Sequence, residues 1–277
     1  YTRTLLKLLD KDILVDRLNA NTIKTAFYKK SNPGTYNERL TRFKAFIRWA
    51  YENDYVKDIH WIDKLKALPN PEKNQKLKNK YLEKKELHTL LDAMDIKVWH
   101  QLTQLMVLSG IRVGEAMALE RNNFDFKARL IYIDKTLDHI NKATNSPKTF
   151  TSKRQVYMQK ELYHLCNEIY QESLNNNLRY GHSSPLLFAD ENGNYVNYYS
   201  YNKYLKENSQ VCLGRSISTH ILRHTHTSLM AEAGVSLEAI SRRLGHANSR
   251  VTRDIYLHIT SRQKERDNAE FENVGIL

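Results

Sequence analysis

Apolar residues recur at helical spacing through the first part of the chain. The clearest segment is 35–55, which opens with Thr35 and Glu38 at the separation of a capping box. Its large apolar positions then fall on one helical face: Leu40, Phe43, Phe46, Ile47 and Ala50. Weaker helical patterns occupy residues 3–10 and 20–30. The front of the chain is therefore predicted to be all-helical.

Prolines and lysines interrupt this pattern. Residues 69–80, PNPEKNQKLKNK, hold two prolines and several lysines but almost no apolar side chains, which predicts an extended, basic linker. Earlier in the chain, the prolyl-glycyl stretch at 32–34 predicts a turn. We therefore expect a helical front domain over 1–68, the linker, a second domain over 81–260 and a tail over 261–277.

Helix and strand patterns alternate beyond the linker. YLEKKELHTLLDAM (81–94) and VWHQLTQLMVLSG (98–110) predict two helices, and Gly110 ends the second. ARLIYID (128–134) and RQVYMQ (154–159) are rich in β-branched and aromatic residues and flank a polar loop, which predicts a long hairpin. Helical patterns resume near 160–178, near 197–208 and from 219 onward. The second domain is therefore predicted to be α+β, and the whole chain mainly α with a small β-sheet.

The charge of the chain favours a polyanionic partner. The 277 residues carry a formal net charge of +12, and residues 1–80 alone hold eighteen Lys and Arg against nine Asp and Glu. A basic segment gains affinity for DNA because phosphate neutralisation releases counterions, although charge alone fits a merely soluble basic protein equally well. The candidate phosphate contacts lie in the front helix and the linker: Arg39, Arg42, Lys44, Arg48, Lys76 and Lys78.

Other features of the composition bear on location. Cys166 and Cys212 are too few and too far apart for a disulfide framework or a cysteine-based zinc site, which fits a reducing compartment. We find no signal peptide and no apolar run long enough to cross a bilayer. We therefore expect a cytoplasmic, nucleoid-associated protein with no membrane partner. Because the chain begins at Tyr1 rather than at a methionine, we also expect that a segment precedes it.

Charged residues recur at places where a packed core would not require them. In SGIRVGEAMALE (109–120), Arg112 stands three residues before Glu115, so both side chains can lie at a helix start and face one way. Taken alone, this pattern is usually a surface salt bridge. In SPKTFTSKRQVYM (146–158), Lys148 lies in the hairpin loop, where a solvated lysine is the common interpretation.

The segment 219–258 is rich in histidine and allows three interpretations. His220 and His224 have the i,i+4 spacing of zinc ligands, but the helix lacks the Glu of an H-E-x-x-H motif, so we expect no metal. AGVSLEAISRRLG (233–245) has the form of a helix-turn-helix that reads DNA. Alternatively, His220 and Arg223 at i,i+3 project from one helical face toward a common target, as in a catalytic centre.

Order and spacing favour the catalytic interpretation. Five motifs follow one another along the chain: G-I-R-x-G-E, a hairpin lysine, H-x-x-R-H, L-G-H and T-x-x-x-Y. His246 lies twenty-three residues after Arg223, and Tyr256 lies ten residues after His246. This arrangement resembles the catalytic domain of the tyrosine recombinases, the lambda-integrase-like family, over roughly residues 80–260. The helical, basic front resembles the core-binding domain of that family. By analogy with the family's K-T-x-x-S-x-R pattern, we select Lys148 rather than the other lysines nearby.

The resemblance implies a site of six catalytic residues: Arg112, Lys148, His220, Arg223, His246 and Tyr256. The two guanidinium groups suit the negative charge that grows on phosphate oxygens during attack on a phosphodiester. Tyr256 is the expected nucleophile, and His220 the expected acceptor of its proton. His246 is expected to donate a hydrogen bond to a phosphate oxygen, and Lys148 to protonate the leaving 5′-oxygen. Glu115 would orient the site and balance its charge.

The resemblance also implies how the reaction proceeds. Specific double-stranded DNA sites are cut and rejoined through a 3′-phosphotyrosyl intermediate and a Holliday junction, by a homotetramer on synapsed DNA, without a cofactor or a metal. We expect an integrase of a phage or conjugative element that works with accessory DNA-bending or directionality factors. The tail over 261–277, a charged helix with an apolar end, is expected to dock on a neighbouring subunit. Two rivals stay open: a type IB topoisomerase-like enzyme that relaxes DNA as a monomer, and a non-catalytic helix-turn-helix regulator.

Overall fold

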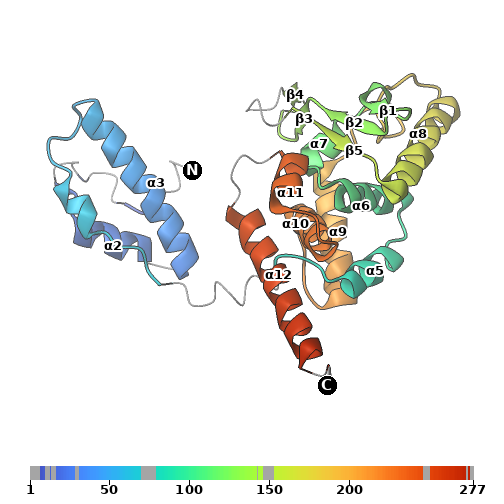
Figure 1. Cartoon of the computed structure of the whole chain (residues 1–277). Coiled ribbons are helices and arrows are strands. Elements are labelled where there is room, and N and C mark those ends of the chain that lie inside the picture. Colours follow the sequence, from blue (N-terminus) through green and yellow to red (C-terminus); the bar gives the residue numbers. More distant parts are fainter. Residues whose placement is uncertain are drawn as a thin grey trace. The chain divides into compact units, whose positions relative to one another are not determined.

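A computed structural model of the chain describes residues 7–9, 13, 17–28, 31–69, 79–141, 143–145, 153–245, 250–272 and 274. The chain divides into two compact units, residues 1–75 (unit 1) and 76–277 (unit 2), each shown in Figure 1. The described part of unit 1 is helical, and unit 2 combines helices with a small antiparallel sheet, as the sequence predicts. Every helix in the described part of the chain is too short or too polar for a bilayer-spanning segment.

Unit 1 packs its helices around an apolar core. Its elements are α2 (Ala20–Tyr28), α3 (Pro33–Glu52) and the 3-10 turn η2 (His60–Lys64). The buried side chains of the core are Ile23, Phe27, Tyr36, Leu40, Phe43, Ile47, Ile62 and Leu65. The rings of Phe27 and Phe43 meet edge to face with centroids 5.4 Å apart, which joins α2 to α3. The helices predicted over 20–30 and 35–55 are confirmed, whereas most of segment 3–10 lies outside the described residues.

Two details predicted for α3 are wrong. The helix begins at Pro33, and Asn32 caps it by accepting a hydrogen bond from the Thr35 N–H at 2.8 Å. Because the first helical N–H has no partner within the helix, proline is tolerated there, and the expected turn is a helix start instead. Phe46 does not join the core face: it is 47% exposed, and its ring stacks on Trp49 with centroids 6.0 Å apart. The buried stripe follows positions three and four apart, and Phe46 lies beside it.

Unit 2 is built mainly from helices. Their bounds are Lys84–Asp92 (α5), Lys97–Ser109 (α6), Val113–Met117 (α7), Lys160–Tyr180 (α8), Tyr198–Leu213 (α9), Thr219–Glu232 (α10), Leu237–Leu244 (α11) and Arg250–Phe271 (α12), and a 3-10 turn, η4, spans Arg121–Asn123. α6 lies in the core, where it packs against α8 and α10. The predicted helices are confirmed, and α12 continues through residue 260, where the sequence pattern places the start of a separate tail.

The main sheet of unit 2 is antiparallel, with strand order β1-β2-β5. These strands span Phe124–Asp125 (β1), Leu130–Ile133 (β2) and Arg154–Tyr157 (β5). Ile131 pairs with Val156 and both are buried, whereas the next pair, Tyr132 with Gln155, is exposed. The predicted hairpin is confirmed. Its loop also contains a strand pair that the sequence pattern did not predict, β3 (Thr136–Asp138) with β4 (Ala143–Asn145).

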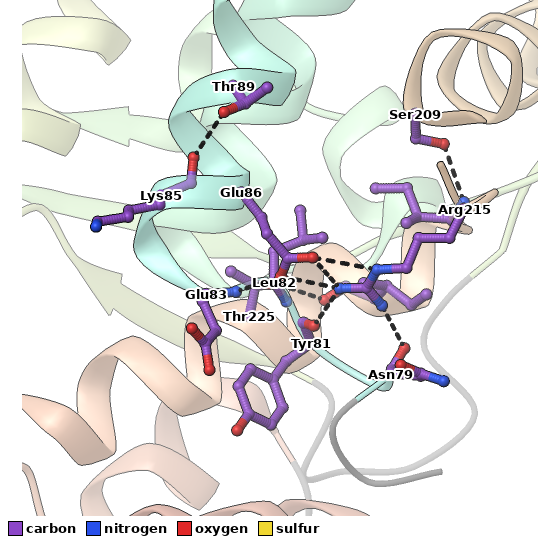
Figure 2. A network of polar contacts seen from close by, with 12 residues as sticks. Asn79, Tyr81, Leu82, Glu83, Lys85, Glu86, Thr89, Ser209, Arg215 and Thr225 are labelled. Atoms are coloured by element: carbon purple, nitrogen blue, oxygen red, sulfur yellow. Dashed lines mark hydrogen bonds and ion pairs between the residues drawn. The ribbon is translucent and has the colours of Figure 1, made fainter. Parts of the chain in front are cut away.

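Arg215 fixes the first described residues of unit 2. It lies between α9 and α10, and its guanidinium contacts several groups of the entry segment, residues 79–83, and of α5 (Figure 2). Nη2 donates to both carboxylate oxygens of Glu86 at 2.8 and 2.9 Å. The carbonyls of Asn79 and Tyr81 accept from Nη1 and Nη2 at 3.0 and 3.1 Å. The entry segment is therefore attached to the connection between α9 and α10.

A second apolar cluster lies beneath α12. Its buried residues come from the entry segment, α10, α11 and α12: Tyr81, Ala231, Ile240, Leu244, Ile255 and Ile259. The Leu82 N–H donates to Thr225 Oγ1 on α10 at 2.9 Å, and Arg262 on α12 pairs with Glu83 at 3.1 Å. The entry segment and α12, the helix that carries Tyr256, therefore pack together.

Candidate active site

Arg112 and Glu115 lie together at the start of α7. α6 ends at Gly110, whose φ of 72° is a left-handed conformation that glycine adopts readily. Arg112 then precedes α7, and Glu115 lies in its first turn. The Glu115 carboxylate accepts hydrogen bonds from the Arg112 N–H at 2.8 Å and from Arg112 Nη1 at 2.7 Å. The three-residue spacing therefore places a cation and an anion at one corner.

Glu115 also faces a second arginine, which the sequence pattern did not single out. Arg154, at the start of β5, donates from Nη1 to Oε1 at 3.1 Å and from Nη2 to Oε2 at 2.8 Å. Only 6% of the Arg154 side chain and 3% of the Glu115 side chain are exposed. Burial alone would raise the pKa of Glu115, but the hydrogen bonds and charges of Arg154, followed by those of Arg112, lower it to about 2. The carboxylate is therefore ionised at physiological pH.

Arg223 is buried on α10 and joins two helix ends. Its Nη1 donates to the carbonyl of Gly110 at 2.6 Å, and its Nη2 donates to the carbonyl of Leu244 at 2.5 Å. Burial, followed by the charges of Arg112 and Arg154, lowers the pKa of Arg223 to about 9, although the charge of Glu115 acts in the opposite direction. The guanidinium therefore stays protonated at neutral pH. Arg112 is also close enough for its charge to act on Arg223.

His226 and Arg243 form a buried support beneath this corner. Nδ1 of His226 is 2.7 Å from the carbonyl of Val107, which can only accept, so Nδ1 carries the proton. Nε2 then accepts a hydrogen bond from Nε of Arg243 at 3.2 Å. Burial, together with the charge of Arg243, lowers the pKa of His226 to about 3, so the ring is neutral at physiological pH.

The histidines at the start of α10 differ in exposure. His220 is the second residue of the helix and is exposed. His224, one turn later, is partly buried, and its pKa is lowered to about 4 by burial, by His220 and then by Arg223 and Lys80. Across the part of the chain that the structure describes, no three His, Cys, Asp or Glu side chains gather closely enough to hold a metal ion.

Tyr256 lies in the second turn of α12 and packs against the cluster beneath that helix, which includes Leu244. The carbonyl of Leu244 also accepts from Arg223, so α12 and the arginine corner share the end of α11. In Figure 1, α12 lies beside α10 and α11, which it contacts. Among the described residues, no hydrogen bond joins the Tyr256 hydroxyl to Arg112 or Arg223.

The predicted catalytic residues therefore fall into three groups. Arg112, which binds Glu115, and Arg223, which binds the carbonyl of Gly110, come together at the corner between α6 and α7. His220 and Tyr256 lie on the helices α10 and α12, and no hydrogen bond between described residues joins their side chains to Arg112 or Glu115. The last two, Lys148 and His246, lie outside the described residues.

Comparison with known proteins identifies the family. The model of the phage integrase family matches residues 80–263, more than half of the chain. This chain belongs to the phage integrase family. Its relatives include tyrosine recombinases, enzymes that cut and rejoin DNA, and the resemblance drawn from the sequence motifs is confirmed.

Individual relatives and structures agree with this family. The integrase is 29% identical over 280 residues to a probable integrase of prophage ps2 in Lactococcus lactis, covering 92% of this chain and 71% of the relative. It is 25% identical to the integrase of Staphylococcus phage L54a, covering 91% of this chain and 78% of the relative. The Tn1549 transposon integrase in complex with transposon right end DNA superposes with a TM-score of 0.71 at 19% identity, covering 95% of this chain and 91% of that chain. The XerH site-specific recombinase superposes with a TM-score of 0.68 at 18% sequence identity, covering 94% of this chain and 74% of that chain.

Two basic residues of the front helix, Arg39 and Arg42, already have partners within unit 1. Arg39 Nη1 donates to the carbonyl of Phe27 at 3.0 Å, and Arg42 pairs with Glu38 at 2.6 Å. The other candidate DNA contacts are Lys44, which is partly buried, Arg48, which is exposed, and Lys76 and Lys78, which lie outside the described residues. Their contacts with DNA therefore stay predictions.

The structure of segment 233–245 differs from what the helix-turn-helix interpretation requires, because a basic side chain of this segment is bonded within unit 2. Arg243, a basic residue of this segment, turns toward the interior of the integrase. Its Nη1 donates to the carbonyl of Tyr157 at 2.8 Å. Its Nη2 donates to the carbonyl of Leu108 at 3.1 Å and to Oε1 of Gln159 at 2.8 Å. Arg243 therefore holds α11 against β5 and α6.

The sequence pattern missed three residues of this site: Arg154, His226 and Arg243. A signal for Arg154 is present, because it is the arginine of the K-T-x-x-S-x-R pattern that selects Lys148. No such signal marks His226 or Arg243, since their partners are backbone carbonyls, each other and, for Arg243, the side chain of Gln159.

Proposed function

We propose that this integrase cuts and rejoins DNA through a covalent intermediate on Tyr256. The Tyr256 oxygen attacks phosphorus, the bond from phosphorus to the 5′-oxygen breaks, and a 3′-phosphotyrosyl link forms. His220 accepts the phenol proton, Lys148 gives a proton to the leaving oxygen, and His246 donates a hydrogen bond to a phosphate oxygen. A second 5′-hydroxyl then attacks the link and releases Tyr256. Because one phosphate ester replaces another, the reaction needs no ATP.

The observation that carries this proposal is the convergence of Arg112 and Arg223 at the corner between α6 and α7. Arg112 binds Glu115 at the start of α7, and Arg223, which comes from α10, donates to the carbonyl of Gly110, two residues before Arg112. The charges of Arg112 and Glu115 both act on Arg223. Two planar guanidinium groups suit the oxygens of a phosphate, whose charge grows during displacement. The Arg112 side chain is 34% exposed, so the N–H groups that do not face Glu115 can reach a bound phosphate. Glu115 limits the excess of positive charge.

We further propose a homotetramer that synapses two DNA sites, exchanges one pair of strands, passes through a Holliday junction and exchanges the other pair. Unit 1 and the linker would hold the DNA through Lys44, Arg48, Lys76 and Lys78, with Arg39 and Arg42 as further candidates. The tail over 261–277 would dock on a neighbouring subunit, accessory DNA-bending or directionality factors would assist, and the reaction would take place at the nucleoid. The basic front supports this proposal, as do phage and transposon relatives and neighbours solved with DNA.

A nicked suicide substrate tests the nucleophile. Cleavage beside the nick releases a short strand and traps the covalent adduct, which migrates slowly on a denaturing gel and can be mapped to one residue. We expect the adduct on Tyr256, no adduct with Tyr256→Phe, and normal adduct formation with the matched control Tyr199→Phe, which alters an exposed tyrosine. DNA binding by Tyr256→Phe should match the wild type. An adduct on another residue contradicts the assignment.

The same preparation separates the rival functions. Recombinant products that require paired target sites support the integrase. Relaxation of any supercoiled plasmid by the monomer would favour the topoisomerase-like enzyme. Unchanged biological activity of Tyr256→Phe would favour the non-catalytic regulator. Arg112→Lys should abolish cleavage because lysine lacks the planar fork of the guanidinium.

A further inference from the structure

Arg154 connects three parts of the candidate site through one buried side chain. Its Nη1 and Nη2 bind the two carboxylate oxygens of Glu115 at 3.1 and 2.8 Å. Its Nε donates to the carbonyl of Arg243, in the last turn of α11, at 2.7 Å. The side chain itself comes from the start of β5. The hairpin strand, the α7 corner and the end of α11 therefore meet at this guanidinium.

The contact with Glu115 controls what Arg112 can do. A buried carboxylate requires cationic or hydrogen-bonding partners for both oxygens. Arg154 supplies one bond to each oxygen, so Glu115 needs only a single side-chain bond from Arg112, through Nη1. Without Arg154, the carboxylate would draw Arg112 inward to replace the lost donors. The guanidinium of Arg112 would then turn away from a phosphate.

The contact with α11 controls the position of Arg223. The carbonyl of Arg243 accepts from Arg154, and the next carbonyl along the chain, that of Leu244, accepts from Arg223. A second bond joins the same two elements in the opposite direction, because the Arg243 side chain on α11 donates to the carbonyl of Tyr157 on β5 at 2.8 Å. These two bonds hold α11 against β5 from both directions. The acceptor that orients Arg223 is thereby fixed relative to the α7 corner.

We propose that Arg154 is a positioning residue for strand cleavage, which aims Arg112 through Glu115 and Arg223 through the end of α11 at one phosphate. This inference rests on the roles proposed for Arg112 and Arg223. It assigns Arg154 no contact with DNA. It also differs from a purely structural ion pair, which would stabilise the fold without changing the rate of cleavage by each folded molecule.

Single-turnover cleavage of the suicide substrate by Arg154→Lys tests the proposal. A lysine keeps the charge but cannot bind both carboxylate oxygens and the Arg243 carbonyl in the same geometry. The amplitude of the reaction counts active molecules, and its rate constant measures cleavage by each of them. We expect the rate constant to fall about 10- to 100-fold, as for other residues that orient reacting groups, with DNA affinity within about twofold of the wild type. The matched control is Gln155→Ala, which alters the exposed neighbour on β5 and should cleave normally.

The pH dependence gives a readout that a structural role would not move. The charged groups that bind Glu115 are Arg112 at the start of α7 and Arg154 on β5, and Glu115 also acts on the charge of Arg223 on α10. Loss of the Arg154 charge in Arg154→Gln raises the pKa of the buried carboxyl, so the acid limb of the cleavage rate should move to higher pH than in the wild type. A wild-type rate constant for Arg154→Lys, or an acid limb of Arg154→Gln that does not move, overturns the proposal.

A double-mutant cycle covers the case in which a single variant folds poorly. If Arg154 acts through Glu115, the combination of Arg154→Lys with Glu115→Gln should cleave no more slowly than the slower single variant. Independent, multiplicative losses overturn the Glu115 route. Tyr256→Phe and Arg112→Lys are measured alongside. Adduct formation by Tyr256→Phe refutes the proposed nucleophile, and full activity of Arg112→Lys refutes the proposed phosphate clamp. Neither result depends on Arg154.

Discussion

Gly110 is the position where a single methyl group should most clearly disturb the candidate site. A Cβ built there would lie 2.5 Å from Cδ2 of His226 and 2.8 Å from Cδ2 of Leu244. The His226 ring cannot swing aside easily, because Nδ1 is bonded to Val107 and Nε2 to Arg243. Gly110→Ala therefore forces either the end of α6 or the end of α11 to move.

The magnitude follows from two separate effects. Gly110 has a φ of 72°, and an L side chain in this region costs about 1–2 kcal/mol. Forcing an extra carbon into a packed interior costs about 1–3 kcal/mol more. The free energy of unfolding of unit 2 should therefore fall by about 2–5 kcal/mol. Cleavage should also slow, because Arg223 is held by the carbonyl of Gly110 itself and by that of Leu244.

Gly181→Ala is the matched control. Gly181 also ends a helix, with a φ of 70°, but a Cβ there meets no described atom within 4 Å. The free energy of unfolding of Gly181→Ala should therefore fall only by the cost of the left-handed backbone conformation, about 1–2 kcal/mol. Urea denaturation followed by the fluorescence of Trp99 on α6 reports unit 2, provided that the two tryptophans of unit 1 are replaced by phenylalanine in every variant. If Gly110→Ala and Gly181→Ala lose the same unfolding free energy within about 0.5 kcal/mol, the packing argument is refuted.

Two further predictions concern stability. Arg215→Ala should lower the free energy of unfolding of unit 2 by about 1.5–3 kcal/mol, since Glu86 and two backbone carbonyls lose a charged donor. Urea denaturation beside the exposed control Arg179→Ala, expected within about 0.5 kcal/mol of the wild type, measures this, and equal values would contradict it. His226 has a pKa of about 3 in the folded state, below the unfolded value of about 6.5, so folding disfavours its proton. Its contribution to stability is complete above pH 6.5 and is lost as the pH falls toward 3, by about 1.4 kcal/mol per pH unit, because the unfolded chain binds the proton first. His226→Gln should therefore show a shallower decline in unfolding free energy between about pH 6.5 and 4 than the wild type, and parallel curves would show that another group is responsible.

Elements with a strong local pattern could be predicted from the sequence. The helix over 35–55, the pairing of β2 with β5 and the helix stop at Gly110 all follow from periodicity or from one residue's conformational preference. The errors lie where two local preferences compete. Pro33 is common in turns and also at the first position of a helix, and only the cap from Asn32 decides between them. The β3–β4 pair escaped notice because its strands are too short for a clear alternation.

The site could be predicted as far as its residues were close in sequence. Arg112 and Glu115 meet because two residues three positions apart at the start of a helix face the same way. Arg243 shows the limit of this reasoning. Two basic residues near the end of α11 fit a DNA-reading helix equally well, and only packing against β5 and α6 turns Arg243 toward the interior. Which face of a helix meets which neighbour depends on contacts between distant segments.

The chemistry of Glu115 nevertheless indicates that a second cation, which the sequence pattern did not single out, must bind this carboxylate. A carboxylate with 3% of its surface exposed is not kept ionised by one partly exposed arginine, because the loss of hydration exceeds what a single partner returns. A second cation must therefore approach from another element. The hairpin strand carries Arg154 at its first paired position, opposite Ile133, at the end of β5 nearest the loop that contains Lys148. A buried acid in a predicted phosphate site is thus itself a reason to look for a second arginine, and the burial of Glu115, rather than any motif, makes Arg154 necessary.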